Sequence, residues 1–222
     1  MSTVTNVCFH GVGTLDRERE REPGEASYWV GRDAFLEILD ALVGRPDVRI
    51  SFDDGNASDV EVALPALQER DLTATFFVLA GRLDTPGSLA RDHVRELAGA
   101  GMRIGTHGMH HRSWRAMSAA EAHLELVEAR DTIAEVAGTV VTEAALPLGL
   151  YDRRVLANLR RHGYRRVFTS DRARASESAW LSPRYSVVST DTGESVRHLL
   201  LAEPGARQRA TGLLARTVKR LR

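Results

Sequence analysis

The stretch "ISFDDGNASD", from Ile50 to Asp59, combines a strand-like apolar run with two adjacent carboxylates, Asp53 and Asp54. Neighbouring carboxylates repel each other, and burying them carries a desolvation cost. Taken alone, the pair is typical of a turn, because Asp-Gly is a common turn dipeptide. The alternative is a site that uses both charges. The pair lies at the end of an apolar run, and the rest of the sequence is needed to distinguish a turn from a functional site.

Short apolar runs alternate along the chain with segments of helical period, which is the pattern of βα units. In one such segment Phe35, Ile38 and Leu42 share a helical face, and "SAAE" from Ser118 to Glu121 is a capping box that opens a later helix. Parallel strands with helical crossovers have both faces covered, so the pattern favours a barrel or a doubly wound sheet. The seven expected strands are residues 4–9, 48–52, 73–79, 102–106, 140–146, 164–169 and, with the weakest pattern, 185–189.

The composition is that of a globular protein. Of the 222 residues, 43% are hydrophobic and 27% charged, and the net charge is zero, whereas a nucleic-acid binder would carry an excess of Lys and Arg. No apolar run approaches about 18 residues and the start lacks a leader pattern, so we expect no membrane span and a cytoplasmic location. The charged stretch "DREREREPGE" (residues 16–25) is expected to be a solvated loop. The length fits a single domain over residues 1–222, with a basic helix or tail at 204–222.

Unusual polar residues follow several of the expected strands. Asp53 and Asp54 follow "VRISF", His107 follows "MRIGT", His10 follows "VCF", and Pro147 follows "VTEAAL". In barrels and open α/β sheets, sites lie at the carboxyl ends of the strands. Each residue alone has an ordinary explanation, such as a turn or a strand-end histidine. Their recurrence at equivalent strand ends favours a shared site.

These residue types are suited to binding a metal. Two imidazoles and one carboxylate make a three-ligand set for a catalytic Zn²⁺, with a fourth position open for water. His107 and His111, in "HGMHH", are four residues apart, which places both rings on one side of a helix or a tight turn. A cation bound to one carboxylate of the Asp53–Asp54 pair offsets their repulsion, and the second carboxylate then remains ionised beside it as a base.

The motifs "SFDDG" and "HGMHH", in this order and spacing, resemble those of the NodB-homology polysaccharide deacetylases, a group similar to carbohydrate esterase family 4. That family consists of distorted (β/α)7 barrels with a bound divalent metal. The similarity runs from about residue 5 to about residue 170 and implies a single α/β domain of this barrel type. By the resemblance, Asp54, His107 and His111 would hold the metal, expected to be Zn²⁺, and Asp53 would be the general base.

The chain departs from the family's pattern in three places. Gly108 follows the first metal histidine, where Ser or Thr is usual. The third motif reads "ALPLG" and lacks the arginine that usually steers the base, for which Arg184 is a candidate replacement. The late Leu-x-x-His motif that usually supplies the general acid has no match. The chain resembles certain bacterial poly-N-acetylglucosamine deacetylases of this family whose acid histidine lies near the N-terminus, and His10 is in that place here.

The resemblance implies a metal-dependent hydrolase that removes an N-acetyl group from a sugar or glycan-related substrate, with Asp53 as base and His10 as acid. The expected cytoplasmic location favours a small acetylated sugar or a precursor over mature polysaccharide. Two alternatives stay open: a hydrolase of another non-peptide C–N bond, such as a cyclic amide, and a carbohydrate-binding homologue without catalysis. The candidate substrate contacts are Pro147, Tyr151, Trp114 and Arg184.

Overall fold

The computed structural model describes residues 2–15 and 20–202. Its parallel strands pair side by side in the order β1, β4, β5, β6, β7, β8, β10, and β10 pairs back onto β1. This closure confirms the predicted (β/α)7 barrel. The barrel strands are β1 Thr3–Phe9, β4 Val48–Asp54, β5 Ala74–Val78, β6 Arg103–Thr106, β7 Glu143–Ala145, β8 Arg166–Thr169 and β10 Leu181–Ser186.

The predicted bounds of the last strand are wrong. It was expected at residues 185–189, but β10 begins at Leu181 and ends at Ser186. Pro183 lies inside it, and proline is rare within a sheet because it donates no ladder hydrogen bond. The side chain of Arg184 is buried in the barrel interior, so the strand also lacks the apolar run expected of a buried strand.

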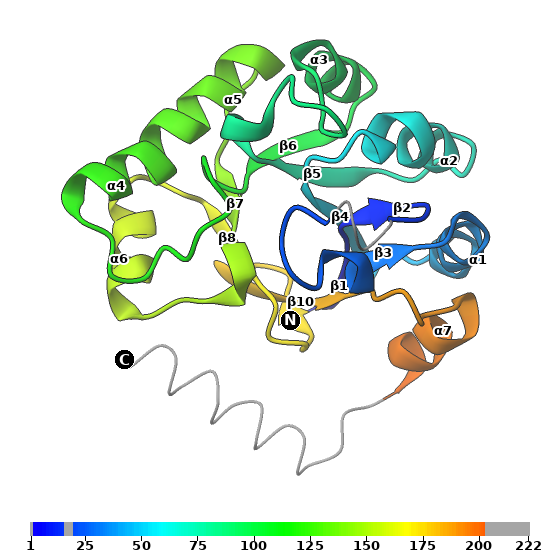
Figure 1. Ribbon diagram of the computed structural model, residues 1–222. Coiled ribbons are helices and arrows are strands. Elements are labelled where there is room, and N and C mark those ends of the chain that lie inside the picture. Colours follow the sequence, from blue (N-terminus) through cyan, green and yellow to red (C-terminus); the bar gives the residue numbers. More distant parts are fainter. Residues whose placement is uncertain (1, 16–19, 203–222) are drawn as a thin grey trace.

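Helices surround the barrel strands (Figure 1). The capping box predicted at Ser118 is confirmed: its hydroxyl accepts from the Glu121 backbone at 3.3 Å, and the Glu121 carboxylate accepts from the Ser118 backbone at 2.8 Å. The helices are α1 Arg32–Leu42, α2 Leu64–Gln68, α3 Arg91–Gly99, α4 Ala119–His123, α5 Ala129–Ala137, α6 Arg153–Arg161 and α7 Gly193–Leu201, with π-helical turns η3 Asp59–Ala63 before α2 and η5 Leu124–Glu128 between α4 and α5.

The two faces of the barrel wall differ in chemistry. The rings of Phe9, Phe52 and Phe76 stack along neighbouring strands at 5.2 and 4.7 Å, and Phe9 meets Phe35 of α1 at 5.1 Å. These rings therefore face the surrounding helices. Because successive strand residues point to opposite faces, the neighbour of Phe52, Asp53, points into the barrel. The alternating side-chain directions along β4 therefore place the Asp53 carboxylate in the barrel interior.

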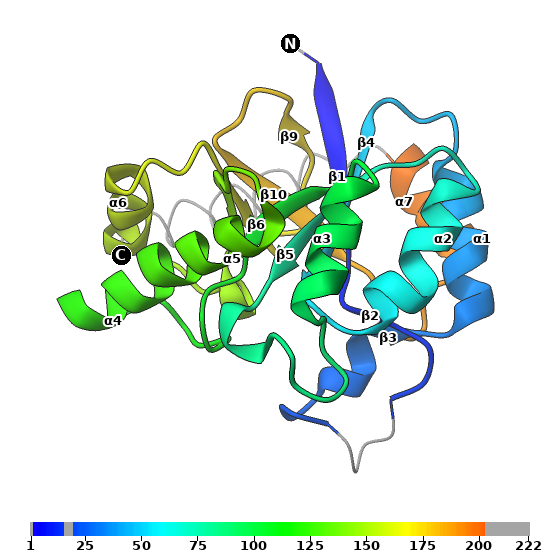
Figure 2. The ribbon, with the colours of Figure 1, turned by 90° about the horizontal axis from the view of Figure 1, so that it is seen from above.

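Short elements flank the two ends of the barrel. Beyond the carboxyl end of β1 lie β2 Gly11–Val12, the 3₁₀ turn η2 Glu25–Tyr28 and β3 Trp29–Val30, at the end opposite the N-terminus in Figure 2. At the other end β9 Ala175–Ser176 pairs antiparallel with β1. Within the part of the chain that the structure describes, no helix has the length and apolar character needed to cross a bilayer. The predicted basic tail at 204–222 lies outside the described residues.

Candidate metal centre and catalytic site

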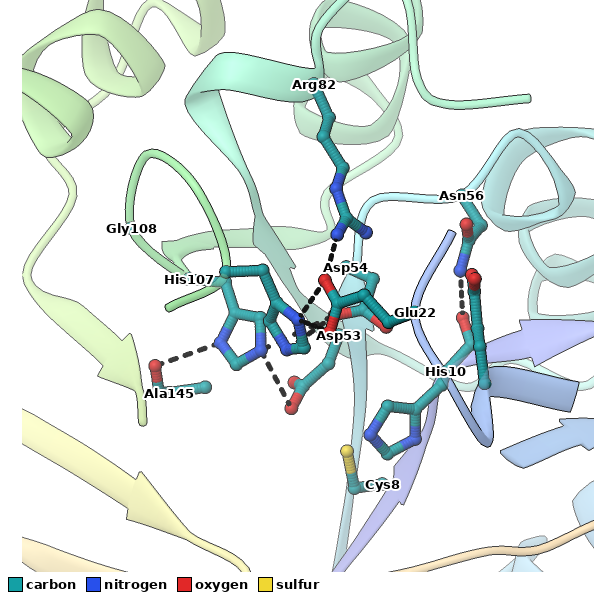
Figure 3. A network of polar contacts seen from close by, with 12 residues as sticks. Cys8, His10, Glu22, Asp53, Asp54, Asn56, Arg82, His107, Gly108 and Ala145 are labelled. Atoms are coloured by element: carbon teal, nitrogen blue, oxygen red, sulfur yellow. Dashed lines mark hydrogen bonds and ion pairs between the residues drawn. The ribbon is translucent and has the colours of Figure 1, made fainter. Parts of the chain in front are cut away.

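Three predicted metal ligands converge at the carboxyl end of the barrel (Figure 3). Asp54 ends β4, His107 follows β6, and His111 lies on the loop beyond it. The Asp54 Oδ1 atom lies 3.5 Å from His107 Nε2 and 3.4 Å from His111 Nε2. This oxygen is buried and has no hydrogen-bond partner among the described residues. Since buried polar atoms normally have partners, an unpartnered oxygen facing two ring nitrogens fits a bound cation.

Hydrogen bonds on the far side of each ring prepare the histidines to bind a metal. His107 Nδ1 lies 2.9 Å from the carbonyl oxygen of Ala145, and His111 Nδ1 lies 2.7 and 2.6 Å from the two carboxylate oxygens of Glu22. Because each Nδ1 faces an acceptor, the proton of the neutral ring lies on Nδ1 and Nε2 keeps its lone pair. Burial lowers the pKa of His107 to about 4, so that ring is neutral near pH 7.

Two of these residues have strained backbones. The φ angles of Asp54 and His111 are 76° and 47°, in the left-handed region that side-chain-bearing residues rarely occupy. Such conformations cost about 1 to 3 kcal/mol each, and persist only where the surrounding structure holds them. Both strained residues are among the three converging ligands, and strained backbone conformations tend to cluster at functional sites.

Asp53, the other carboxylate of the pair, is bound by an arginine inside the barrel. The two terminal nitrogens of Arg184, on β10, each donate to one Asp53 oxygen at 2.6 Å. Both side chains are buried, and the guanidinium lies near the Phe77 and Phe168 rings. Burial alone would raise the pKa of Asp53, but Arg184 outweighs it and, with His107, holds that pKa well below its ordinary value. Asp53 is therefore ionised and held in one orientation.

This contact of Arg184 with Asp53 is the one expected of a substitute for the missing arginine of the third motif, and the substitution itself stays a prediction. Arg184 is 1% exposed, and its two terminal nitrogens donate to Asp53 and Ser51. The prediction that Arg184 contacts substrate is wrong for this arrangement, because the barrel wall and Asp53 enclose its guanidinium.

His10 follows β1 and lies on the Asp53 side of the site (Figure 3). One ring nitrogen of His10, Cys8 Sγ and an Asp53 oxygen all lie within 4.8 Å of one another. The His10 ring packs 4.8 Å from the ring of Tyr28, and its carbonyl oxygen accepts from Asn56 Nδ2 at 2.9 Å. Its Nδ1 has no hydrogen-bond partner within residues 2–15 and 20–202. This placement brings His10 to the site; its role as an acid stays a prediction.

A cavity of about 320 Å³ lies over these groups, at the lower end of the usual size range of about 300–1,000 Å³ for ligand pockets. His10, Asp53 and the three converging ligands line it. At its edge Tyr28 and Leu148 present exposed apolar surface, with 41% and 55% of each residue accessible. The cavity therefore combines charged groups with apolar rim surface, the combination that an amphipathic ligand requires.

The predicted aromatic contacts lie elsewhere. Trp114 is 1% exposed and packs in a second apolar cluster, and Tyr151, also buried, donates its hydroxyl to Asp171 at 2.6 Å. Both lie outside the cavity, so the prediction that they stack on a sugar is corrected: they are packing residues. Pro147 is buried at the start of η6 Pro147–Gly149 and does not line the cavity, whereas its neighbours Leu146, Leu148 and Gly149 do.

The charged stretch at residues 16–25 contains the residue that sequence reasoning missed. Residues 16–19 lie outside the described part; Arg21, Pro23 and Gly24 are exposed as expected of a solvated loop, but Glu22 and Glu25 also line the cavity. Arg21 donates to Ser88 Oγ at 2.8 Å and also contacts Asn56. The charges of this stretch nearly cancel and it contains no motif. No signal in the sequence therefore predicted its contact with His111.

A second missed residue, Glu125 of η5, supports the loop that carries the histidines. Its Oε2 accepts from the backbone of Met109 at 2.8 Å and lies 3.4 Å from Trp114 Nε1. A Cβ at Gly108 would lie 2.5 Å from this oxygen, and φ there is +89°. The Ser or Thr usual in the resembled family therefore does not fit, because the Glu125 carboxylate takes its space.

Comparison with known proteins agrees with this geometry. The model of a protein family described as "Polysaccharide deacetylase" matches residues 42–167, more than half of the chain, and these include the DDG and HGMHH motifs. The chain belongs to the polysaccharide deacetylase family. The expected family resemblance is therefore confirmed.

Individual relatives of this polysaccharide deacetylase family member are distant. The chain is 22% identical to the protein YxkH of Bacillus subtilis (strain 168) over 172 residues, which are 78% of this chain and 57% of YxkH. It is 30% identical to an uncharacterised 30.6 kDa protein of Geobacillus stearothermophilus over 128 residues, 57% of this chain and 47% of that protein. The chain thus spans about half the length of these curated relatives.

Solved structures share the fold. The Streptococcus pyogenes deacetylase PplD, in complex with acetate, matches with a TM-score of 0.78 at 18% identity, over 90% of this chain and 99% of PplD. IcaB from Ammonifex degensii matches with a TM-score of 0.73 at 22% identity, over 91% of this chain and 98% of IcaB. At these identities the likeness establishes the barrel architecture.

Proposed function

We propose that this chain is a divalent-metal-dependent deacetylase that removes an N-acetyl group from a sugar or glycan-related substrate. One observation carries the proposal: the buried, unpartnered Oδ1 of Asp54 faces the Nε2 atoms of both His107 and His111. Family membership and the deacetylase PplD as a structural neighbour support the choice of reaction.

The donor set suggests the identity of the metal. Two imidazoles and one carboxylate suit Zn²⁺, and both rings present Nε2 because their Nδ1 atoms donate to Ala145 and Glu22. A bound Zn²⁺ supplies Lewis-acid polarisation of an oxygen atom and activates water. Asp54, His107 and His111 are the residues that would hold it.

Asp53 acts as the general base. Its carboxylate is ionised because Arg184 outweighs the effect of burial, and the two hydrogen bonds of 2.6 Å fix its direction. It lines the cavity next to Asp54, with Oδ2 3.9 Å from His107 Nε2. A carboxylate fixed at this position accepts a proton from the attacking water without first moving.

His10 acts as the general acid. Its ring lines the same cavity, and a ring nitrogen lies within 4.8 Å of an Asp53 oxygen, so both groups reach one bound acetamide. A protonated His10 donates to the amine nitrogen as the C–N bond breaks, which releases acetate and the free amine. The exposed faces of Tyr28 and Leu148 offer the sugar ring an apolar surface at the rim.

The test is acetate release from a panel of N-acetylated mono- and oligosaccharides, measured with Zn²⁺ present, after chelation and after Zn²⁺ is restored. The proposal predicts release that stops on chelation and returns with the metal. Cyclic amides in the same panel distinguish hydrolysis of another C–N bond. Binding of an acetylated sugar without acetate release would contradict catalysis and favour a binding-only homologue.

A further inference from the structure

We infer that Glu22 is a positioning residue of the metal site: it holds the ring of His111 in the metal-binding orientation and is itself held by Arg82. The inference rests on the proposed metal site. It adds to that site a residue that lies outside the part of the chain matched by the family model, residues 42–167.

The two histidines are supported in different ways. His107 directly follows β6, its side chain is almost fully buried, and its Nδ1 faces the backbone carbonyl of Ala145. His111 lies on a loop in a left-handed conformation, its side chain is 11% exposed, and its Nδ1 faces the side chain of Glu22. The barrel wall therefore fixes His107, whereas the orientation of His111 depends on a contact from a distant segment.

The geometry assigns Glu22 to orientation rather than to metal binding. Both its oxygens approach Nδ1 of His111, at 2.7 and 2.6 Å, while Nε2 of the same ring faces Asp54. A charged acceptor on Nδ1 keeps the proton there, fixes the ring and raises the basicity of Nε2. These are the three properties that a neutral metal-binding imidazole needs.

Arg82 completes a closed set of contacts. Its guanidinium binds Glu22 Oε1, one of the oxygens that accept from His111, as Figure 3 shows for the Arg82–Glu22 contact. Arg82 ends the turn η4 Ala80–Arg82, whose backbone donates to the carbonyls of Gly108 and Met109 at 3.0 and 3.1 Å. The residue that holds Glu22 is thus fastened to the loop that carries His111.

Glu22 is not the only residue that fastens its segment to the barrel. The neighbouring Arg21 contacts Ser88 and Asn56, and pairs with Glu25 at 2.8 Å. Glu20 accepts from the backbone of Ala26 at 2.9 Å. Because these contacts remain when Glu22 is changed, Glu22 variants test the contact to His111 rather than the fold of the segment.

The experiment measures Zn²⁺ affinity by competition with a chromophoric chelator, starting from metal-free protein and without substrate. Glu22→Ala should weaken binding by about 10- to 100-fold, the usual effect of losing such a partner. Glu22→Gln should weaken it less, because its amide oxygen still accepts from Nδ1 but carries no charge. Glu20→Gln is the matched control in the same segment and should bind Zn²⁺ as the wild type does.

A second readout needs no metal. In ¹⁵N NMR spectra of the metal-free protein, Glu22→Ala should shift the His111 ring away from the Nδ1-protonated form and leave His107 unchanged. Wild-type affinity in Glu22→Ala, or equal weakening in Glu20→Gln, would overturn the inference while leaving the proposed function intact. Failure of the wild-type protein to bind Zn²⁺ at all would overturn the proposed function as well.

Discussion

The segment matched by the family model and the segments that flank it contribute different things to the site. Residues 42–167 supply Asp53 and the three converging ligands, which lie at the carboxyl ends of β4 and β6 and on the loop that follows β6. The flanking segments supply His10, Glu22 and Arg184, each next to one of those groups. The shared segment thus provides the proposed metal ligands and base, whereas the flanks provide the proposed acid, His10, and two residues that orient other groups, Glu22 and Arg184.

The Asp53–Arg184 pair shows how a closed barrel allows this division. The two residues are 131 positions apart in sequence, yet β1 alone separates β4 from β10 because the barrel closes. An inward-facing position on β10 can therefore reach the interior carboxylate on β4. An arginine missing from one motif can be supplied by another strand without changing the fold.

The largest effect is expected from the shared segment. Asp53→Asn should lower turnover on the order of 10⁴-fold, the upper end for a positioned base, because an amide cannot accept the proton of water. Zn²⁺ content should stay at the wild-type level, since Asp54 and both histidines remain. Steady-state kinetics and metal analysis of the same preparation check both halves. Full activity in this variant would show that the base lies elsewhere.

The next effect tests whether a flanking residue does chemistry of its own. His10→Gln should lower kcat by about 10²- to 10³-fold by removing the proton donor, and should leave Zn²⁺ affinity unchanged. Its control is His123→Gln, which alters an exposed histidine on α4. Unchanged kcat in His10→Gln would return His10 to an ordinary strand-end histidine and make orientation the only contribution of the flanks.

The pH dependence of activity in an Arg184 variant tests whether Arg184 orients and ionises Asp53 without taking part in the reaction itself. The guanidinium lowers the pKa of Asp53, so Arg184→Gln should raise that pKa, and activity should then be lost at a higher pH as the solution is made more acidic. In the wild type, the lowered pKa of Asp53 contributes stability that is present above its ordinary pKa of about 3.9 and is lost as the pH falls through the folded-state pKa, and Arg184→Gln should remove this contribution. Turnover near pH 7 should fall about 10- to 100-fold, less than in Asp53→Asn, since the base remains.

Because Arg184→Gln leaves a buried carboxylate unpaired, it should also destabilise the fold by about 3 to 5 kcal/mol. Arg184→Lys keeps the charge but loses the two-pronged contact, and should lie between Gln and wild type. The surface variant Arg172→Gln is the control. A pH–rate profile of Arg184→Lys and Arg184→Gln that matches the wild type would contradict the role given to this pair.

The smallest effect concerns support within the shared segment. Glu125→Ala leaves the backbone N–H of Met109 without its acceptor, which should lower the free energy of unfolding by about 1 to 3 kcal/mol. Each kcal/mol corresponds to roughly 2 to 4 °C in Tm for a chain of this size. Thermal unfolding checks it, with Glu121→Ala, which removes the capping box at the start of the adjoining helix α4, measured alongside. Equal Tm values for Glu125→Ala and wild type would show that the loop is held by other contacts.

Local sequence signals and the family resemblance together predicted the barrel and the proposed metal ligands. Alternating βα segments predicted the strands, and the ends of those strands placed Asp54 near His107, because the carboxyl ends of parallel strands meet at one face. The spacing between His107 and His111 indicated that both rings face one side, and the family resemblance then assigned Asp54 and both histidines to the metal.

The supporting residues depend on contacts that no local pattern encodes. Glu22 is one acidic residue in a run of alternating charges, and its selection follows only from where the loop lies against His111. Trp114 shows the converse error: it follows a motif in sequence, but its side chain turns into the core and contacts Glu125. Proximity in sequence places a residue near a site, whereas the fold decides which way it faces.

The central claim is that Asp54, His107 and His111 form one divalent metal site. Metal analysis of purified protein after reconstitution with Zn²⁺ and removal of the excess tests it most directly, with Asp54→Asn prepared in parallel. The account predicts one Zn²⁺ per wild-type chain and none retained by Asp54→Asn. A wild-type protein that retains no divalent metal, or an Asp54→Asn variant that retains a full equivalent, would contradict it.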